Sequence, residues 1–128
     1  MLVRQARPAE SLSVRRLLDA AMLEIDDLEA RLDAGDVLVA VEGDRLVGAI
    51  VLEPRDRGAY VSAIAVSRRR RDRGIGTALV ECALEREGRL TARFDERVRP
   101  FYQSLGFSIE SIDDERYRGE REGRPTPS

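Results

Sequence analysis

The chain has 128 residues, of which 42% are hydrophobic and 36% charged, and this balance predicts one soluble domain able to bury a core. Its 22 basic residues are all arginines and 24 acidic residues outnumber them, so the net charge of −2 argues against a general attraction to nucleic acid or an anionic membrane. Histidine is absent and Cys82 is the single cysteine, which excludes an internal disulfide, a Cys/His zinc site and a histidine-activated nucleophile.

The spacing of apolar residues predicts strands and helices along nearly the whole chain. Pro54 is expected to end a strand, and Gly106 to end a helix. In chain order we predict a strand over 2–6, helices over 11–25 and 27–33, strands over 37–41, 46–52 and 60–66, a helix from 75 to about 88, a strand over 90–94, a short helix over 98–105, and strands over 107–112 and 115–121.

This order predicts an α/β (α+β) fold. A three-stranded meander followed by β-α-β crossovers gives a mixed, mostly antiparallel central sheet with helices on both faces. We expect a single domain over residues 1–121 and a polar, flexible tail over 122–128. No apolar run approaches the ~20 residues of a membrane span and no signal peptide is recognisable, so the expected location is cytoplasmic.

The most informative segment is the turn after the strand over 60–66. It carries Arg71, Gly74 and Gly76 and leads into a helix. A strand, a glycine turn and a helix N-terminus together form a phosphate site, because the first N–H groups of a helix are unpaired and the helix dipole is positive there. The turn lacks the lysine of a nucleoside-triphosphate loop and the third glycine of a dinucleotide fingerprint.

The turn resembles the acyl-CoA-binding motif of the GCN5-related N-acetyltransferases (the GNAT superfamily), in which an Arg or Gln is followed by two residues, Gly, one residue, and Gly or Ala. Residues 101–107, Phe-Tyr-Gln-Ser-Leu-Gly-Phe, resemble the C-terminal signature of the same family. The resemblance covers about residues 2–119 and implies the GNAT acyl-CoA N-acyltransferase fold. The sequence departs from the family at Asp95, where asparagine is common, and at Val98, where alanine is common.

The resemblance implies an N-acetyltransferase that moves the acetyl group of acetyl-CoA to a primary amine by direct attack in a ternary complex, without a metal. Tyr102 would protonate the departing thiolate, or would merely pack on the face it shares with Val98 and Leu105. A backbone N–H near the end of the preceding strand would polarise the thioester. The residues implied in CoA binding are Ile64, Ala65, Val66, Arg71, Asp72, Arg73, Gly74, Ile75, Gly76 and Thr77.

The general base is the least determined part of the site. Glu53 is the first candidate and Asp95 the second, and either could act through a water. Each could equally be a surface acid, and no base is needed if the amine binds in its neutral form. The acids of residues 24–27 would favour a cationic amine, or they are a solvated helix end.

Two other functions remain open. One is a non-catalytic regulatory module that binds acyl-CoA. The other is a nucleic-acid binder that uses the arginines of residues 68–73, against which stand the negative net charge and the scarcity of aromatic residues. For the enzyme, the expected partner is a small-molecule or peptide amine, with no nucleic acid or membrane, and the resemblance is compatible with a homodimer.

Overall fold

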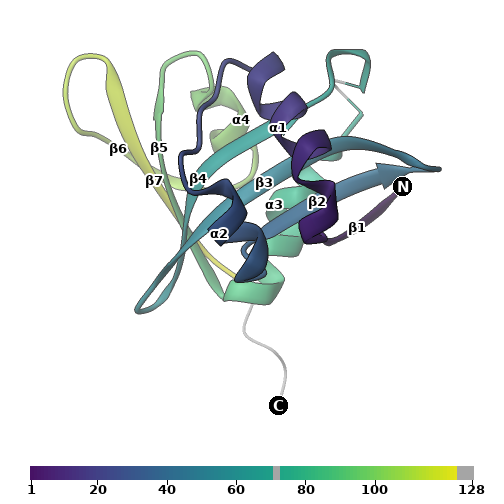
Figure 1. The fold of residues 1–128 in the computed structure, drawn as a ribbon. Coiled ribbons are helices and arrows are strands. Elements are labelled where there is room, and N and C mark those ends of the chain that lie inside the picture. Colours follow the sequence, from purple (N-terminus) through teal and green to yellow (C-terminus); the bar gives the residue numbers. More distant parts are fainter. Residues whose placement is uncertain (71–72, 124–128) are drawn as a thin grey trace.

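The computed structural model describes residues 1–70 and 73–123. The helices and strands alternate along the chain nearly as expected (Figure 1). They are β1 (Leu2–Gln5), the 3-10 turn η1 (Pro8–Glu10), α1 (Ser11–Ala20), α2 (Leu28–Asp33), β2 (Val37–Glu42), β3 (Arg45–Arg55), β4 (Gly58–Val66), the 3-10 turn η2 (Arg68–Arg70), α3 (Ile75–Glu87), β5 (Arg89–Asp95), α4 (Arg99–Ser104), β6 (Ser108–Ser111) and β7 (Arg116–Glu122).

The strands form one seven-stranded sheet in the order β1-β2-β3-β4-β5-β7-β6. β4 and β5 run parallel, and the other neighbouring pairs run antiparallel. Helices α1 and α2 lie on one face and α3 on the other (Figure 1). This arrangement confirms the predicted fold class, a mixed, mostly antiparallel sheet with helices on both faces.

Each face of the sheet has its own apolar core, because strand side chains alternate between faces. One cluster joins the sheet to α3 and α4, and the other joins it to α1 and α2. A bulge in β4 interrupts the alternation: Val51 of β3 pairs with Ala63, whereas Leu52 pairs with Val61, so Ser62 is the extra residue. Val61 consequently packs on the α3 side, while Ala63 packs on the α1–α2 side.

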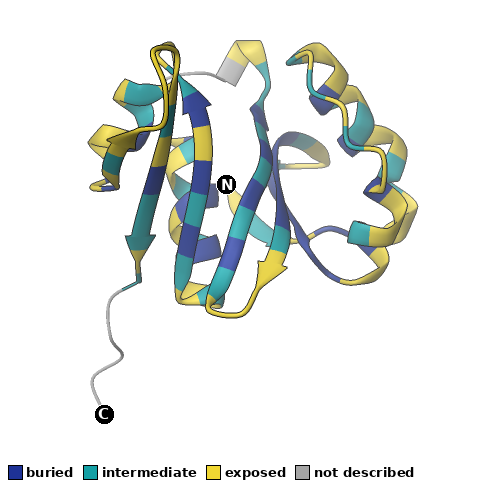
Figure 2. Ribbon diagram, turned by 90° about the vertical axis from the view of Figure 1, so that its left-hand side faces the viewer, coloured by how far each residue is buried: buried dark blue, intermediate teal, exposed yellow. Residues whose placement is uncertain are grey.

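The sheet opens between β4 and β5. Their pairing is limited to Ala59 with Leu90 and Tyr60 with Thr91, at the beginning of both strands. Gly58 allows β4 and β5 to approach each other closely at this end, because a Cβ there would collide with the backbone oxygen of Arg89. Beyond the paired residues the two strands diverge (Figure 2). The parallel pair therefore joins the two halves of the sheet at one end and leaves them apart at the other.

Two expectations about element ends are wrong. The helix expected over 11–25 ends at Ala20, because Met22 has a φ of 60° and turns the chain away from the helix. Pro54 does not end β3, which continues to Arg55. The N–H of Leu52 faces β2 and donates to Asp36 O. Because alternate residues of a strand face the same neighbour, the nitrogen of Pro54 also faces this side, where it lies beyond the first residue of β2.

The far end of the chain also differs slightly from expectation. β7 includes Glu122, and the N–H of Gly123 donates to Gly88 O at 2.7 Å, so the ordered strand passes the boundary expected at residue 121. Within the described part of the chain, no helix is both long and apolar enough to cross a membrane.

Candidate active site

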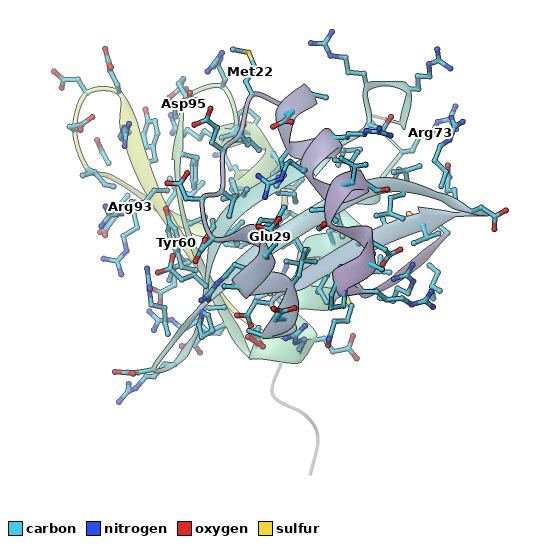
Figure 3. All side chains as sticks on the ribbon, in the orientation of Figure 1. Met22, Glu29, Tyr60, Arg73, Arg93 and Asp95 are labelled. Atoms are coloured by element: carbon cyan, nitrogen blue, oxygen red, sulfur yellow. The ribbon has the colours of Figure 1, made fainter. Side chains whose placement is uncertain are left out.

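The glycine turn leads into α3 as the sequence predicts. Gly74 is the N-cap of α3 and has a φ of 77°, a left-handed conformation that favours glycine. Because glycine has no side chain to cap the helix, the first N–H groups of α3, at Ile75, Gly76 and Thr77, are available to an anion. Arg73 is exposed and lies on the other side of α1 from Asp95 (Figure 3). The predicted ligands Arg71 and Asp72 lie outside the described residues.

Gly76 has a second role that motif reasoning did not identify. A Cβ at this position would lie 3.1 Å from Cε1 and 3.3 Å from Cζ of Phe101, closer than most real Cβ contacts. The absence of a side chain at Gly76 thus lets Phe101 of α4 pack against the first turn of α3. This contact connects the turn that would hold phosphate to the helix that carries Tyr102.

A cleft of about 550 Å³ occupies the opening between β4 and β5. β4 contributes one wall, β5 and α4 the opposite wall, and the segment after α1 closes one side. The lining residues are Ala21, Leu23, Val61, Ser62, Ala63, Ile64, Arg93, Phe94, Asp95, Arg97, Val98, Phe101 and Tyr102.

The backbone of β4 presents polar groups on the cleft side. The N–H of Ser67 donates to Val47 O of β3 at 2.8 Å. Because successive N–H groups of a strand point in opposite directions, the N–H groups of Ile64 and Val66 point away from β3, toward the side on which β5 has separated from β4. Such oriented donors can stabilise an oxygen that becomes negative during acyl transfer.

Tyr102 lies at the centre of an aromatic cluster and also lines the cleft. Its ring stacks on Phe94 at a centroid distance of 4.5 Å, and the rings of Phe107 and Phe101 meet it edge-on at 5.0 and 5.1 Å. The residue is only 4% exposed, and burial raises the pKa of its hydroxyl, with a further contribution from Tyr60. Tyr102 therefore stays protonated at neutral pH and can donate a proton.

The hydroxyl of Tyr102 has no hydrogen bond to another described residue, and it is not among the fully buried polar atoms that lack a partner. The end of α4 fixes this position: Gly106 N–H donates to Gln103 O, and Phe107 N–H donates to Tyr102 O, with Gly106 at a φ of 79°. The expected role of Gly106 in ending the helix is confirmed.

The two candidate bases are both paired with arginine. Glu53 bonds Arg55 at 2.8 Å, and this contact lowers the pKa of its carboxyl group. Asp95 accepts from Arg97 at 3.1 Å, which lowers the pKa of Asp95 as well. Asp95 lines the cleft, whereas Glu53 reaches it only through the Ser62 hydroxyl, which donates to the carboxylate at 3.4 Å.

The Acetyltransferase (GNAT) domain model matches residues 33–109, more than half of the chain. The chain belongs to the GNAT acetyltransferase family. Membership of this family makes it an acetyl-CoA-dependent N-acetyltransferase. Comparison with curated protein sequences gives no match.

Solved structures resemble this GNAT chain over most of its length. An aminoglycoside 6'-N-acetyltransferase complexed with coenzyme A is 18% identical, with a TM-score of 0.81 and 100% coverage of both chains. Ard1 from Thermoplasma volcanium is 21% identical, with a TM-score of 0.79 over 97% of this chain and 98% of its own. N-acetylglutamate synthase from Neisseria gonorrhoeae, complexed with coenzyme A and L-arginine, is 17% identical, with a TM-score of 0.81 over 97% of this chain and 33% of its own. At these identities the likeness concerns the fold.

The GNAT site brings some predicted residues together and leaves others apart. Ile64, Phe101 and Tyr102 line one cleft, with Ala65 and Val66 following on β4. The acids of residues 24–27 precede α2 and do not line the cleft. Asp27 forms an ion pair with Arg31 at 3.2 Å. Arg68 and Arg69 line a separate hollow of about 610 Å³ between α1 and the end of β4. Within the described ranges, no three His, Cys, Asp or Glu side chains gather as a metal site.

Two residues of this site were missed from the sequence. Ser62 is the bulged residue of β4 and lines the cleft, and Gly48 lets α3 approach β3, since a Cβ there would lie 2.9 Å from Cγ2 of Ile75. A glycine inside a run of apolar residues, Val47 to Ala49, was the available signal for the close approach. The bulge has no comparable signal, because it depends on the register with β3.

Proposed function

We propose that the protein transfers the acetyl group of acetyl-CoA to the amine of a small molecule or peptide, by direct attack in a ternary complex. The observation that carries this proposal is the arrangement of three elements near the cleft: the backbone of β4 that faces away from β3, Tyr102, which lines the cleft, and the start of α3, where Gly76 lies close to Phe101 of the cleft.

CoA would lie in the opening between β4 and β5, with its pyrophosphate at the start of α3. The N–H groups of Ile75, Gly76 and Thr77 are the proposed donors. Arg71, Asp72 and Arg73 complete the turn in this proposal, with the guanidinium groups adding positive charge. The thioester would then extend along residues 64–66 of β4.

In the chemical step the amine nitrogen attacks the thioester carbon and the C–S bond breaks. The N–H groups of Ile64 and Val66 stabilise the oxygen while it carries negative charge. Tyr102 donates its hydroxyl proton to the departing sulfur, and the proton released by the amine returns to Tyr102 through water. The amine, the thioester and the acid are thus used in one step without a covalent acyl-enzyme.

Where the amine arrives as an ammonium ion, Glu53 is the proposed route for the additional proton that it loses before attack, through the hydroxyl of Ser62. Its lowered pKa keeps it ionised at neutral pH and makes it a weak base, so its part is to pass the proton on to water. This weakness is also the observation that favours the second candidate function, an acyl-CoA-binding module with little catalysis. An amine that binds in its neutral form removes the need for a base.

The first test is thermal unfolding with acetyl-CoA, CoA, ATP and NAD in separate samples. A ligand at 100 times its dissociation constant stabilises the folded state by ~2.7 kcal/mol, which raises the midpoint by several degrees. We expect a shift with the two CoA compounds alone, followed by detection of free thiol when an amine is added. The absence of a shift with either CoA compound at millimolar concentration refutes the proposal, and a shift without thiol release supports the regulatory module.

A further inference from the structure

A second hollow adjoins the cleft on the face of the sheet that carries α2. It measures about 360 Å³ and is lined by Arg55, Tyr60, Thr91, Ala92, Arg93 and Arg118. Arg93 lines both the hollow and the cleft, so the two are neighbours. Figure 3 shows Tyr60 and Arg93 below Asp95. We call this hollow the arginine pocket.

The arginine pocket follows from strand alternation. Leu90, Ala92 and Phe94 of β5 are buried toward α3, so Thr91 and Arg93 point to the opposite face. Arg118 of β7 is the register partner of Arg93, which places the two side chains next to each other on the same face of the sheet. Both side chains are exposed, so the pair adds nothing to the packing of the sheet. Like charges directly opposite each other destabilise a sheet, and a bound anion would relieve this repulsion.

The acids near the pocket form no ion pair with these two arginines. Neither Arg93 nor Arg118 forms a hydrogen bond or ion pair with another described residue. Glu120, whose pKa Arg118 helps to lower, is bonded to Arg89 at 2.6 Å. Glu110 is the register partner of Arg118 on β6 but makes no ion pair with it.

The third guanidinium and the hydroxyl groups complete a site for an anion. Arg55 is held in place by Glu53 at 2.8 Å and by the ring of Tyr60, whose centroid is 5.2 Å away. Tyr60 and Thr91 supply neutral hydroxyl groups, and none of the lining residues is acidic. Guanidinium groups that line one hollow together with hydroxyl donors provide the groups that bind a carboxylate or phosphate.

We infer that the acceptor is a small primary amine that also carries an anionic group, which the arginine pocket binds while the nitrogen lies in the cleft. Tyr60 of the pocket precedes Ser62 of the cleft by two residues, and two strand residues span about 7 Å. With the nitrogen beside Ser62, the anionic group lies about this distance from it. The inference rests on the proposed acetyl transfer.

The test compares amines of one length that differ only in the charge of the far end: 5-aminopentanoate, pentylamine and 1,5-diaminopentane, with 5-aminopentyl phosphate as the phosphate form. We expect kcat/KM to be at least tenfold higher for one of the two anionic amines than for pentylamine, and lowest for the diamine. The better of the two anionic amines identifies carboxylate or phosphate as the group bound. Equal values for all four, or the highest value for the diamine, overturn the inference.

Variants assign the effect to the pocket. Arg118→Gln is expected to raise KM for the preferred anionic amine about tenfold and to leave kcat/KM for pentylamine within twofold. Arg7→Gln removes an exposed arginine before η1 and should change neither value. An equal loss for every amine in Arg118→Gln, or the same change in Arg7→Gln, contradicts a local anion site.

A binding experiment keeps the inference separate from the proposed activity. Pentanoate and inorganic phosphate, which lack the amine, are titrated against the wild-type protein while the side-chain Nε–Hε signals of arginine are followed by NMR. We expect saturable shifts with one anion, lost in Arg118→Gln and kept in Arg7→Gln. Absence of shifts with both anions refutes the pocket, even if acetyl transfer to pentylamine is observed. Saturable shifts without acetyl transfer to any amine refute the proposed activity instead.

Discussion

Replacement of Tyr102 by phenylalanine separates proton donation from packing. The change removes one oxygen and keeps the ring contacts with Phe94 at 4.5 Å and Phe107 at 5.0 Å. Since the hydroxyl has no hydrogen-bond partner among the described residues, its loss should alter the free energy of unfolding by less than ~1 kcal/mol. Loss of a general acid should reduce kcat by about 100-fold, or ~2.7 kcal/mol of transition-state stabilisation.

The assay measures thiol release at saturating acetyl-CoA and amine, with the CoA dissociation constant determined in parallel. Tyr117→Phe is the matched control, because it removes a hydroxyl from the same aromatic cluster without touching the cleft: Tyr117 does not line the cleft, and its ring lies 6.2 Å from that of Phe94. We expect this control to keep its turnover within twofold. Unchanged turnover in Tyr102→Phe would show that water protonates the thiolate and that Tyr102 is a packing residue.

Three further predictions concern stability. Arg4 lowers the pKa of Glu10 to about 2, so the pair should stabilise the fold by roughly 2–3 kcal/mol above pH 4.5 and lose this effect as the pH falls toward 2. The measurement is chemical denaturation at several pH values. Glu10→Gln should reduce the unfolding free energy by the same amount at neutral pH and match the wild type near pH 2. Gly48→Ala should lower the unfolding free energy by about 1–3 kcal/mol, because its Cβ would press on Ile75, and an unchanged urea midpoint would contradict this close packing. Gly74→Ala has open space for a methyl group but a φ of 77°, so it should cost ~1 kcal/mol by the same assay, and Gly74→Asn should cost less because asparagine tolerates this conformation.

Local patterns were sufficient to predict most of the fold. Hydrophobic periodicity predicted the strands and helices. Gly74 lies just before α3 and Gly106 just after α4, and both glycines have a left-handed conformation. The errors have two causes. The helix expected to reach residue 25 stops at Ala20 because Met22 adopts a positive φ that the apolar spacing does not indicate, and Pro54 stays in β3 because it lies beyond the first residue of β2.

The candidate site could be predicted in part. The glycine turn and Tyr102 carry sequence signals; Tyr102 lines the cleft, and Gly76 of the turn lies close to Phe101, which lines it as well. The bulge at Ser62 and the pairing of Arg93 with Arg118 depend on strand register, which no local pattern states. The Glu53–Arg55 ion pair could have been predicted from the sequence, since residues two apart in a strand share a face.

The short pairing of β4 with β5 has a consequence for how catalytic geometry is kept. Ile64 and Val66 belong to the half-sheet formed by the first 66 residues, whereas Tyr102 belongs to the half formed after residue 88. Among the described residues, β4 and β5 pair only near Tyr60. The separation between the strand proposed to hold the thioester and the proposed acid therefore depends on side-chain contacts such as that of Phe101 on Gly76. Turnover should therefore respond to the size of residue 101, because a smaller side chain lets the two halves approach or separate without breaking a strand.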